Sequence, residues 1–158
     1  MDIPFSEYIF LCVGSDKVIG DSYGPLVGGK LKESFKNMYN NIHIYGTLEE
    51  PISAINLETK VNQIYKEYKH PCIIAIDSAL GHQEKIGTIV ISNTKMQCGK
   101  GTSKKIAYVG DISIRGIVGK NYNQPKYNFT VLQNTSLGYV MKLADITANG
   151  IYNVDKYR

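Results

Sequence analysis

The chain has 158 residues, of which 43% are apolar and 20% charged, a balance typical of one folded domain over residues 1–158 with a sizeable core. No apolar run approaches the ~18 residues of a membrane span, and the N-terminus lacks the basic region and cleavage site of a signal peptide. The net charge is +4, but the sequence has none of the usual signatures of nucleic-acid binding: zinc-ligand spacing, a recognition-helix pattern or a ribonucleoprotein motif. We therefore expect a cytoplasmic protein that binds neither nucleic acid nor membrane.

The first predicted elements are an apolar strand, a polar loop and a helix. Residues 8–13 (YIFLCV) have the β-branched and aromatic content of a buried strand. The loop that follows holds Asp16 and Asp21. Gly24-Pro25 then begins a helix predicted over 25–37, because proline suits the first helical position. Both aspartates therefore follow the carboxyl end of a strand, where ligands and reacting groups collect in open α/β sheets.

The middle of the chain predicts a second strand of the same design. A short strand over 41–45 and a helix over 54–68 come first, and the residue before Pro71 resists helical geometry. The buried strand is then predicted over 72–76 (CIIAI), with Asp77 at its carboxyl end. Asp21 and Asp77 thus follow two apolar strands.

The remaining elements predict the outer part of the sheet and a terminal helix. They are a strand over 86–92, a basic loop over 93–105, an extended segment over 106–118 bent at Gly110-Asp111, a short strand over 129–132 and a helix over 137–149 ended by Gly150. The strand over 86–92 is expected to form an antiparallel hairpin with the strand before it, since the connection is too short for a crossover helix. The pattern indicates an α/β fold, a three-layer α/β/α sandwich with a mostly parallel mixed sheet.

Asp21 and Asp77 are the candidate catalytic residues. Two carboxyl groups held close together cannot both stay ionised, so one pKa rises and the pair can activate a water while protonating a leaving group. The alternatives are a capping role for Asp21 ahead of the helix and a turn role for Asp77.

Asp16, Lys100 and Asp111 are candidate binding residues around this pair. Asp16 is alternatively a solvated turn residue. Asp111 is either a third acid or a residue that satisfies backbone donors at the bend. Lys100 stands between two glycines, in a loop whose N–H groups could hold an anion or which is simply mobile and charged.

No cofactor and no metal site are expected. The glycines of the first loop do not match GxGxxG, and no GKS or GKT follows them. Cys12 and Cys72 belong to predicted buried strands, which leaves Cys98 as the one plausible exposed thiol. His82, which follows Asp77, is either a metal ligand or general base, or an exposed loop residue.

Six motifs, in order along nearly the whole chain, resemble the YyaC family of sporulation proteins. They are GSDKVIGDSYGPLVGGKL, IYGTLEEPISAINL, IIAIDSALG, GKGTSKK, YVGDISIRGIV and LQNTSLGYVMKLAD. That family is in turn similar to the spore germination protease, which degrades small acid-soluble spore proteins. The resemblance implies the phosphorylase/hydrolase-like α/β/α fold shared with hydrogenase maturation peptidases, and a location in the sporulating cell or spore core.

The resemblance also implies roles for particular residues. GDSYGP puts Asp21 where the germination protease has one catalytic aspartate, and Ala75-Ile76-Asp77 stands where it has the second. The maturation peptidases hold nickel with a glutamate, an aspartate and a histidine. Ser22 occupies the position of that glutamate, so Asp77 alone matches and the resemblance does not imply their metal site.

The sequence therefore predicts an aspartic-type endopeptidase that acts on a protein or peptide substrate, with small acid-soluble spore proteins as candidates. Two rival hypotheses stay open. One is a metal-dependent maturation-type peptidase that uses Asp21 and Asp77 with His82 or Asp111. The other is a non-catalytic sporulation protein that uses the fold as a binding module. The oligomeric state is not predicted.

Overall fold

The computed structural model describes residues 4–98 and 107–154. Its strands are β1 (Glu7–Cys12), β2 (Ile42–Tyr45), β3 (Pro71–Gly81), β4 (Ile89–Ser92), β5 (Met96–Cys98), β6 (Ala107–Val109) and β7 (Ile112–Lys120). Its helices are α1 (Tyr23–Ser34), α2 (Leu57–Glu67), α3 (Pro125–Asn134) and α4 (Leu137–Val154), with short 3-10 turns η1 (Ile19–Ser22) and η2 (Gln83–Lys85).

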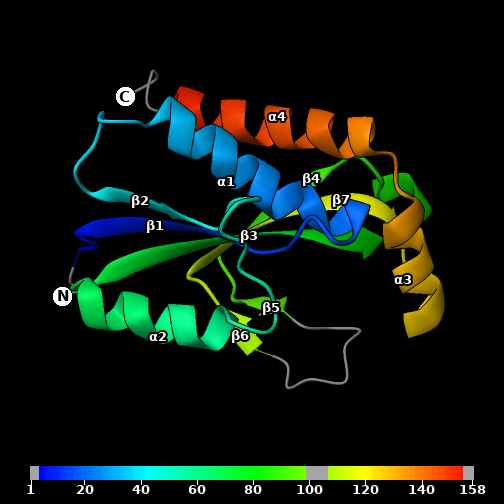
Figure 1. The fold of residues 1–158 in the computed structure, drawn as a ribbon, viewed down its shortest axis with the longest axis horizontal. Helices are drawn as coiled ribbons and strands as arrows, with labels where there is room; N and C mark the ends of the chain where they lie inside the picture. Colours follow the sequence, from blue (N-terminus) through cyan, green and yellow to red (C-terminus); the bar gives the residue numbers. More distant parts are fainter. Residues whose placement is uncertain (1–3, 99–106, 155–158) are drawn as a thin grey trace.

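The helices cover both faces of a central sheet, which gives three layers. α1 and α4 lie on one face, α2 and the small β5–β6 sheet lie on the other, and α3 lies at one end (Figure 1). This is the predicted α/β/α sandwich. Among the described residues, no helix combines the length and apolar character that crossing a membrane requires.

The central sheet has the strand order β2-β1-β3-β7-β4 and is mixed, as predicted. β1 pairs in parallel with β2 and β3, β3 pairs in parallel with β7, and β4 alone is antiparallel. The antiparallel direction of β4 confirms the prediction, but its partner is β7, so the expected hairpin with β3 is wrong. β7 lies between the two, with β3 hydrogen-bonded along one edge and β4 along the other.

Three further sequence predictions are corrected by the structure. Residues 129–132, predicted as a strand, belong to α3, whose first residue is Pro125. Gly150 does not end the last helix, because α4 continues to Val154. The expected loop over 93–105 contains the strand β5, which pairs with β6. Of these segments, β5 owes its conformation to a partner strand that follows it in sequence.

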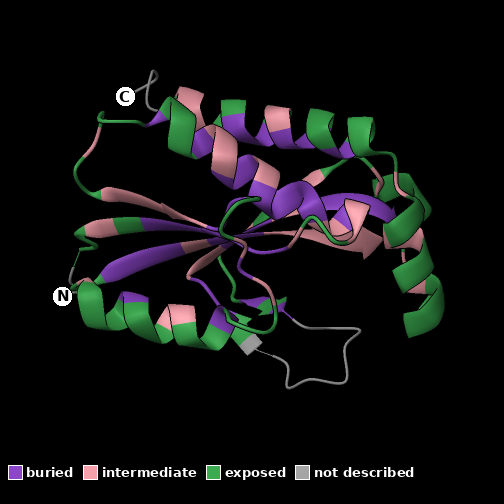
Figure 2. Cartoon of the chain, viewed as in Figure 1, coloured by how far each residue is buried: buried purple, intermediate pink, exposed green. Residues whose placement is uncertain are grey.

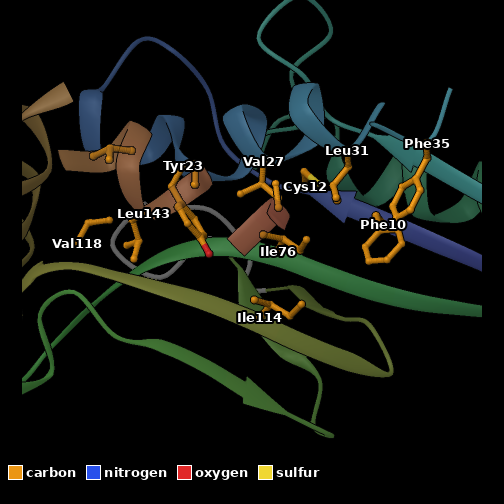
Figure 3. Close-up of a cluster of buried hydrophobic side chains, with 13 residues drawn as sticks. Phe10, Cys12, Tyr23, Val27, Leu31, Phe35, Ile76, Ile114, Val118 and Leu143 are labelled. Atoms are coloured by element: carbon orange, nitrogen blue, oxygen red, sulfur yellow. The ribbon is translucent and has the colours of Figure 1, made fainter. Parts of the chain in front are cut away.

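The larger core cluster fills the space between the sheet and the helices α1 and α4. Figure 2 shows the buried inner faces of these helices and of the central strands. Phe10 of β1, Ile76 of β3 and Ile114 of β7 share this cluster with residues of α1 such as Val27 and Leu31, and Phe10 lies beside Phe35 (Figure 3). The apolar alternation along the strands therefore produces this face of the core.

A second core cluster lies on the opposite face, beneath α2 and the β5–β6 sheet. It includes Ile73 and Ala75 of β3, together with Ile64 of α2 and Cys98 of β5. Cys98 is only 3% exposed, so the prediction of an exposed thiol is wrong. Residues 73, 75 and 77 alternate onto this face, which directs Asp77 toward it as well.

Glycines let α1 approach the sheet at backbone distance. A Cβ on Gly24 would lie 2.0 Å from the carbonyl oxygen of Val13, and one on Gly28 would lie 1.9 Å from that of Gly46. A real Cβ cannot occupy either position, so these two sites require glycine. The close approach fixes the start of α1, and with it the preceding loop, against the end of β1.

Tyr23 anchors α1 to α4 through a buried hydroxyl pair. Its Oη lies 2.7 Å from Thr147 Oγ1, and the Thr147 hydroxyl donates to the Leu143 carbonyl at 2.9 Å.

We expect Thr147→Val to lower the free energy of unfolding more than Tyr23→Phe does, by about 2 kcal/mol against about 1 kcal/mol. Only the first change leaves a buried hydroxyl without a partner. Urea unfolding of both variants measures this, and the reverse order would contradict the account.

Candidate active site

The loop between β1 and α1 brings Asp21 to the end of β1. Gly14 leaves the strand with φ +139°, and its N–H donates to the Ile52 carbonyl at 2.8 Å. The Ser15 N–H then donates to the carbonyl of Asp21 at 3.1 Å, which closes the loop on itself. A Cβ on Gly14 would lie 2.0 Å from that same carbonyl, so glycine is required for the closure. The position of Asp21 is therefore set by backbone contacts.

Asp77 lies where β3 loses its β1 neighbour. The β1–β3 pairing ends at Cys12 and Ile76, and Val13 donates one last hydrogen bond to the Ile76 carbonyl at 2.7 Å. β3 itself continues to Gly81 alongside β7. Asp77 is therefore inside the strand, and the predicted strand end at residue 76 is corrected. Asp77 still follows the last residue of β3 that pairs with β1, and the loop that holds Asp21 begins at the same end of β1.

The two carboxyl groups are electrostatically coupled. Burial raises the pKa of Asp77 well above its usual range, the charge of Asp21 raises it further, and the Ser78 N–H, 2.8 Å from Asp77 Oδ1, partly opposes both effects. Burial also raises the pKa of Asp21. Burial is the cause of the raised pKa at Asp21, whereas burial and the charge of Asp21 both raise the pKa at Asp77. The charge of Asp21 therefore acts on Asp77, one of the two aspartates that the sequence singled out.

Two further residues, which their sequence positions did not connect with the site, neighbour Asp77: Cys98 and Arg115. Burial, followed by the charges of Asp77 and Asp21, raises the pKa of the Cys98 thiol to about 12, so this thiol stays protonated at neutral pH. Arg115 of β7 is the register partner of Asp77. The sequence offered one sign of Arg115, a lone arginine in the apolar segment ISIRGIV. Which residue lies next to it on the neighbouring strand depends on the strand order, which the sequence does not state.

One of the three predicted binding residues, Asp111, lies away from the aspartate pair. Asp16 is exposed on the turn that follows Ser15. Lys100 lies outside the described residues. Asp111 accepts the Ile73 N–H at 2.9 Å and its own N–H donates to the Ile73 carbonyl at 2.7 Å. Ile73 precedes Asp77 by four strand residues, or ~13 Å, so Asp111 satisfies backbone donors at the other end of β3.

The residues at the site do not fit a nickel centre of the maturation-peptidase kind. The described residues contain no group of three His, Cys, Asp or Glu side chains that could hold a metal ion. Ser22, which stands where those enzymes have a glutamate, is buried and donates its hydroxyl to the Ile19 carbonyl at 2.5 Å. His82 is exposed and follows the end of β3, five strand residues or ~16 Å beyond Asp77.

The fold is similar to that of a solved hydrogenase maturation protease. The crystal structure of the [NiFe] hydrogenase maturation protease HycI from Thermococcus kodakarensis KOD1 matches 96% of this chain and 93% of its own, with a TM-score of 0.64. The sequences are 18% identical, so the likeness concerns the fold. The expected peptidase-like α/β architecture is confirmed at that level.

The chain belongs to the YyaC family. The family described as "Protein of unknown function (DUF1256)" matches residues 2–150. The Bacillus subtilis (strain 168) protein described as "Uncharacterized protein YyaC" is 38% identical over 148 residues, which span 94% of this chain and 69% of that protein. The family resemblance read from the six sequence motifs is therefore confirmed.

Proposed function

We propose that this protein is an aspartic-type endopeptidase in which Asp21 and Asp77 share one proton. The observation that supports it is the coupled pair at the carboxyl end of β1, where the charge of Asp21 raises the pKa of a half-buried Asp77. The peptidase-like fold makes hydrolysis of an amide the most direct use of such a pair. The aspartic mechanism is our inference from the two carboxyl groups.

Each carboxyl group has a distinct task in this mechanism. Asp77, whose pKa is raised by both burial and Asp21, holds the shared proton, while Asp21 is ionised. Asp21 takes a proton from a water whose oxygen attacks the carbonyl carbon of the substrate. When the C–N bond breaks, a carboxyl proton passes to the departing nitrogen, which leaves as an amine. The other product is a carboxylic acid, and the pair again holds one proton.

The proposed substrates are small acid-soluble spore proteins, and the proposed location is the cytoplasm of the sporulating cell or the spore core. Membership of the YyaC family supports this assignment through its resemblance to the germination protease. A protein substrate also suits a half-buried pair beside an exposed loop, since an extended segment of the substrate can reach it.

Cleavage of purified small acid-soluble spore proteins, followed by mass spectrometry, tests the proposal. Asp21→Asn and Asp77→Asn are each expected to reduce the rate about 10²- to 10⁴-fold, the usual contribution of a general acid or base. Glu84→Gln, which removes an exposed carboxylate of η2, is the matched control and retains the wild-type rate. The absence of cleavage by the wild-type protein, or unchanged cleavage by either asparagine variant, would refute the proposal.

A further inference from the structure

Arg115 lies on the neighbouring strand from Asp77 and on the same face of the sheet. In the parallel β3–β7 pairing, Arg115 is in register with Asp77, and residues in register point their side chains to the same face. The next strand, β4, places Val90 on its other side. Arg115 is therefore a half-buried cation that stands between an acidic neighbour and an apolar one.

The guanidinium of Arg115 is incompletely paired within the part of the chain that the structure describes. Its Nε is buried and has no hydrogen-bond partner there. The ion pairs of the described residues are Lys30–Asp145, Lys32–Glu50 and His43–Glu7, so Arg115 forms none with Asp77. A buried N–H without an acceptor is rare in folded proteins and calls for an explanation, of which a bound acceptor group is one.

The reaction proposed above creates an acceptor that matches this donor. When the water gives its proton to Asp21, the pair holds two protons, and the negative charge moves to the carbonyl oxygen of the substrate. A guanidinium remains protonated at neutral pH and has five N–H donors in a rigid plane. Donors aimed at such an oxygen in a partly dry site contribute most when the charge develops.

We propose that Arg115 binds the carbonyl oxygen of the scissile amide and stabilises the oxyanion that forms on it. This role rests on the proposed peptidase function and adds a third residue to Asp21 and Asp77. The electron pair of the C=O bond moves onto the oxygen as the water oxygen attacks. It returns to reform the C=O bond when the C–N bond breaks and the nitrogen takes one of the two carboxyl protons.

Steady-state cleavage of small acid-soluble spore proteins by full-length variants tests the role of Arg115. Arg115→Gln is expected to lower kcat about 10²- to 10³-fold with little change in KM, because the lost interaction strengthens only in the transition state. Arg115→Lys retains part of the rate, and added methylguanidinium partly restores Arg115→Ala. Lys120→Gln removes an exposed cation from the same strand and serves as the matched control, with the wild-type kcat expected.

The outcomes separate this role from the peptidase function itself. Suppose that the wild-type protein cleaves, that both aspartates are needed, and that folded Arg115→Gln has an undiminished kcat. This result overturns the role of Arg115 and leaves the proposed peptidase function standing. A rise in KM without a fall in kcat also overturns the role of Arg115. So does a loss of rate that neither Arg115→Lys nor added methylguanidinium recovers, because a merely structural role would not respond to a free cation. If the wild-type protein cleaves none of these substrates, both proposals fail together.

Discussion

Asp77→Asn is expected to make the protein more stable than the wild type above neutral pH, although it should slow the proposed cleavage. The pKa of Asp77 is raised in the folded state by burial and by Asp21, so ionisation of this carboxyl disfavours the folded state. This penalty, the loss of folding free energy caused by ionising Asp77, is absent below the carboxyl pKa of the unfolded chain, about 3.9. It grows as the pH rises toward the folded pKa and is complete above it. Asparagine carries no charge and escapes the penalty.

Thermal unfolding followed by circular dichroism from pH 4 to pH 8 measures this effect. The Tm difference between Asp77→Asn and the wild type should favour the variant at pH 8 and shrink as the pH falls. Glu84→Gln, the exposed control, should shift the free energy of unfolding by no more than about 0.5 kcal/mol at any pH. The opposite result would be an Asp77→Asn variant with a lower Tm than the wild type at pH 8 and a Tm difference that widens as the pH rises. It would contradict the raised pKa of Asp77 in the folded state.

The two aspartates should also act as a unit in catalysis. When residues share one proton, removing either one disables the pair, and removing both costs little more. We therefore expect the double variant Asp21→Asn/Asp77→Asn to cleave no more slowly than the slower single variant. Losses that multiply would mean that the two carboxyl groups act independently.

Gly28→Ala is expected to destabilise the protein by about 3 kcal/mol or more, a large share of the ~5–15 kcal/mol that holds a typical domain together. Its Cβ would lie 1.9 Å from the carbonyl oxygen of Gly46, 3.1 Å from the carbon of that carbonyl and 3.2 Å from the Cβ of Cys12. Backbone cannot move aside as a flexible side chain can. The helix α1 must therefore shift away from the sheet and take Asp21 with it.

The neighbouring Gly29 provides a matched control on the same helix. A Cβ on Gly29 would meet nothing within 4 Å. Gly29→Ala should therefore stabilise the protein by about 0.5–1 kcal/mol, the difference in helix propensity between the two residues. Urea unfolding of the two variants gives both values. Equal effects at positions 28 and 29 would show that the close packing of α1 on β2 and β1 is wrong.

The fold could be predicted where local pattern and burial agree. The apolar runs of β1 and β3 are buried on both faces, and such runs are typical of central parallel strands. The prediction failed at residues 129–132 (FTVL), whose β-branched content suggests a strand. Pro125 begins a helix instead, and Leu132 of this helix packs within 3 Å of the position of a Cβ on Gly20. Tertiary contact thus outweighs local propensity there.

The candidate site was predictable only for residues that follow apolar runs. Asp21 and Asp77 were found because both follow apolar runs, and parallel strands bring such positions to one edge. Arg115 could not be found in this way, since its proximity to Asp77 depends on the β3–β7 register. Asp111 was assigned to the site although it bonds the backbone of Ile73 at the far end of β3. Strand order, which the sequence does not state, decides both cases.

A titration of the Asp21 and Asp77 side-chain carboxyl carbons by NMR tests the central claim most directly. Our account predicts two coupled steps, with the pKa of Asp77 well above the ordinary carboxyl value, and with Asp21→Asn lowering it because the Asp21 charge is one cause of the shift. Two independent titrations near pH 3.9, unaffected by replacing the other aspartate, would contradict the shared proton and the aspartic mechanism built on it.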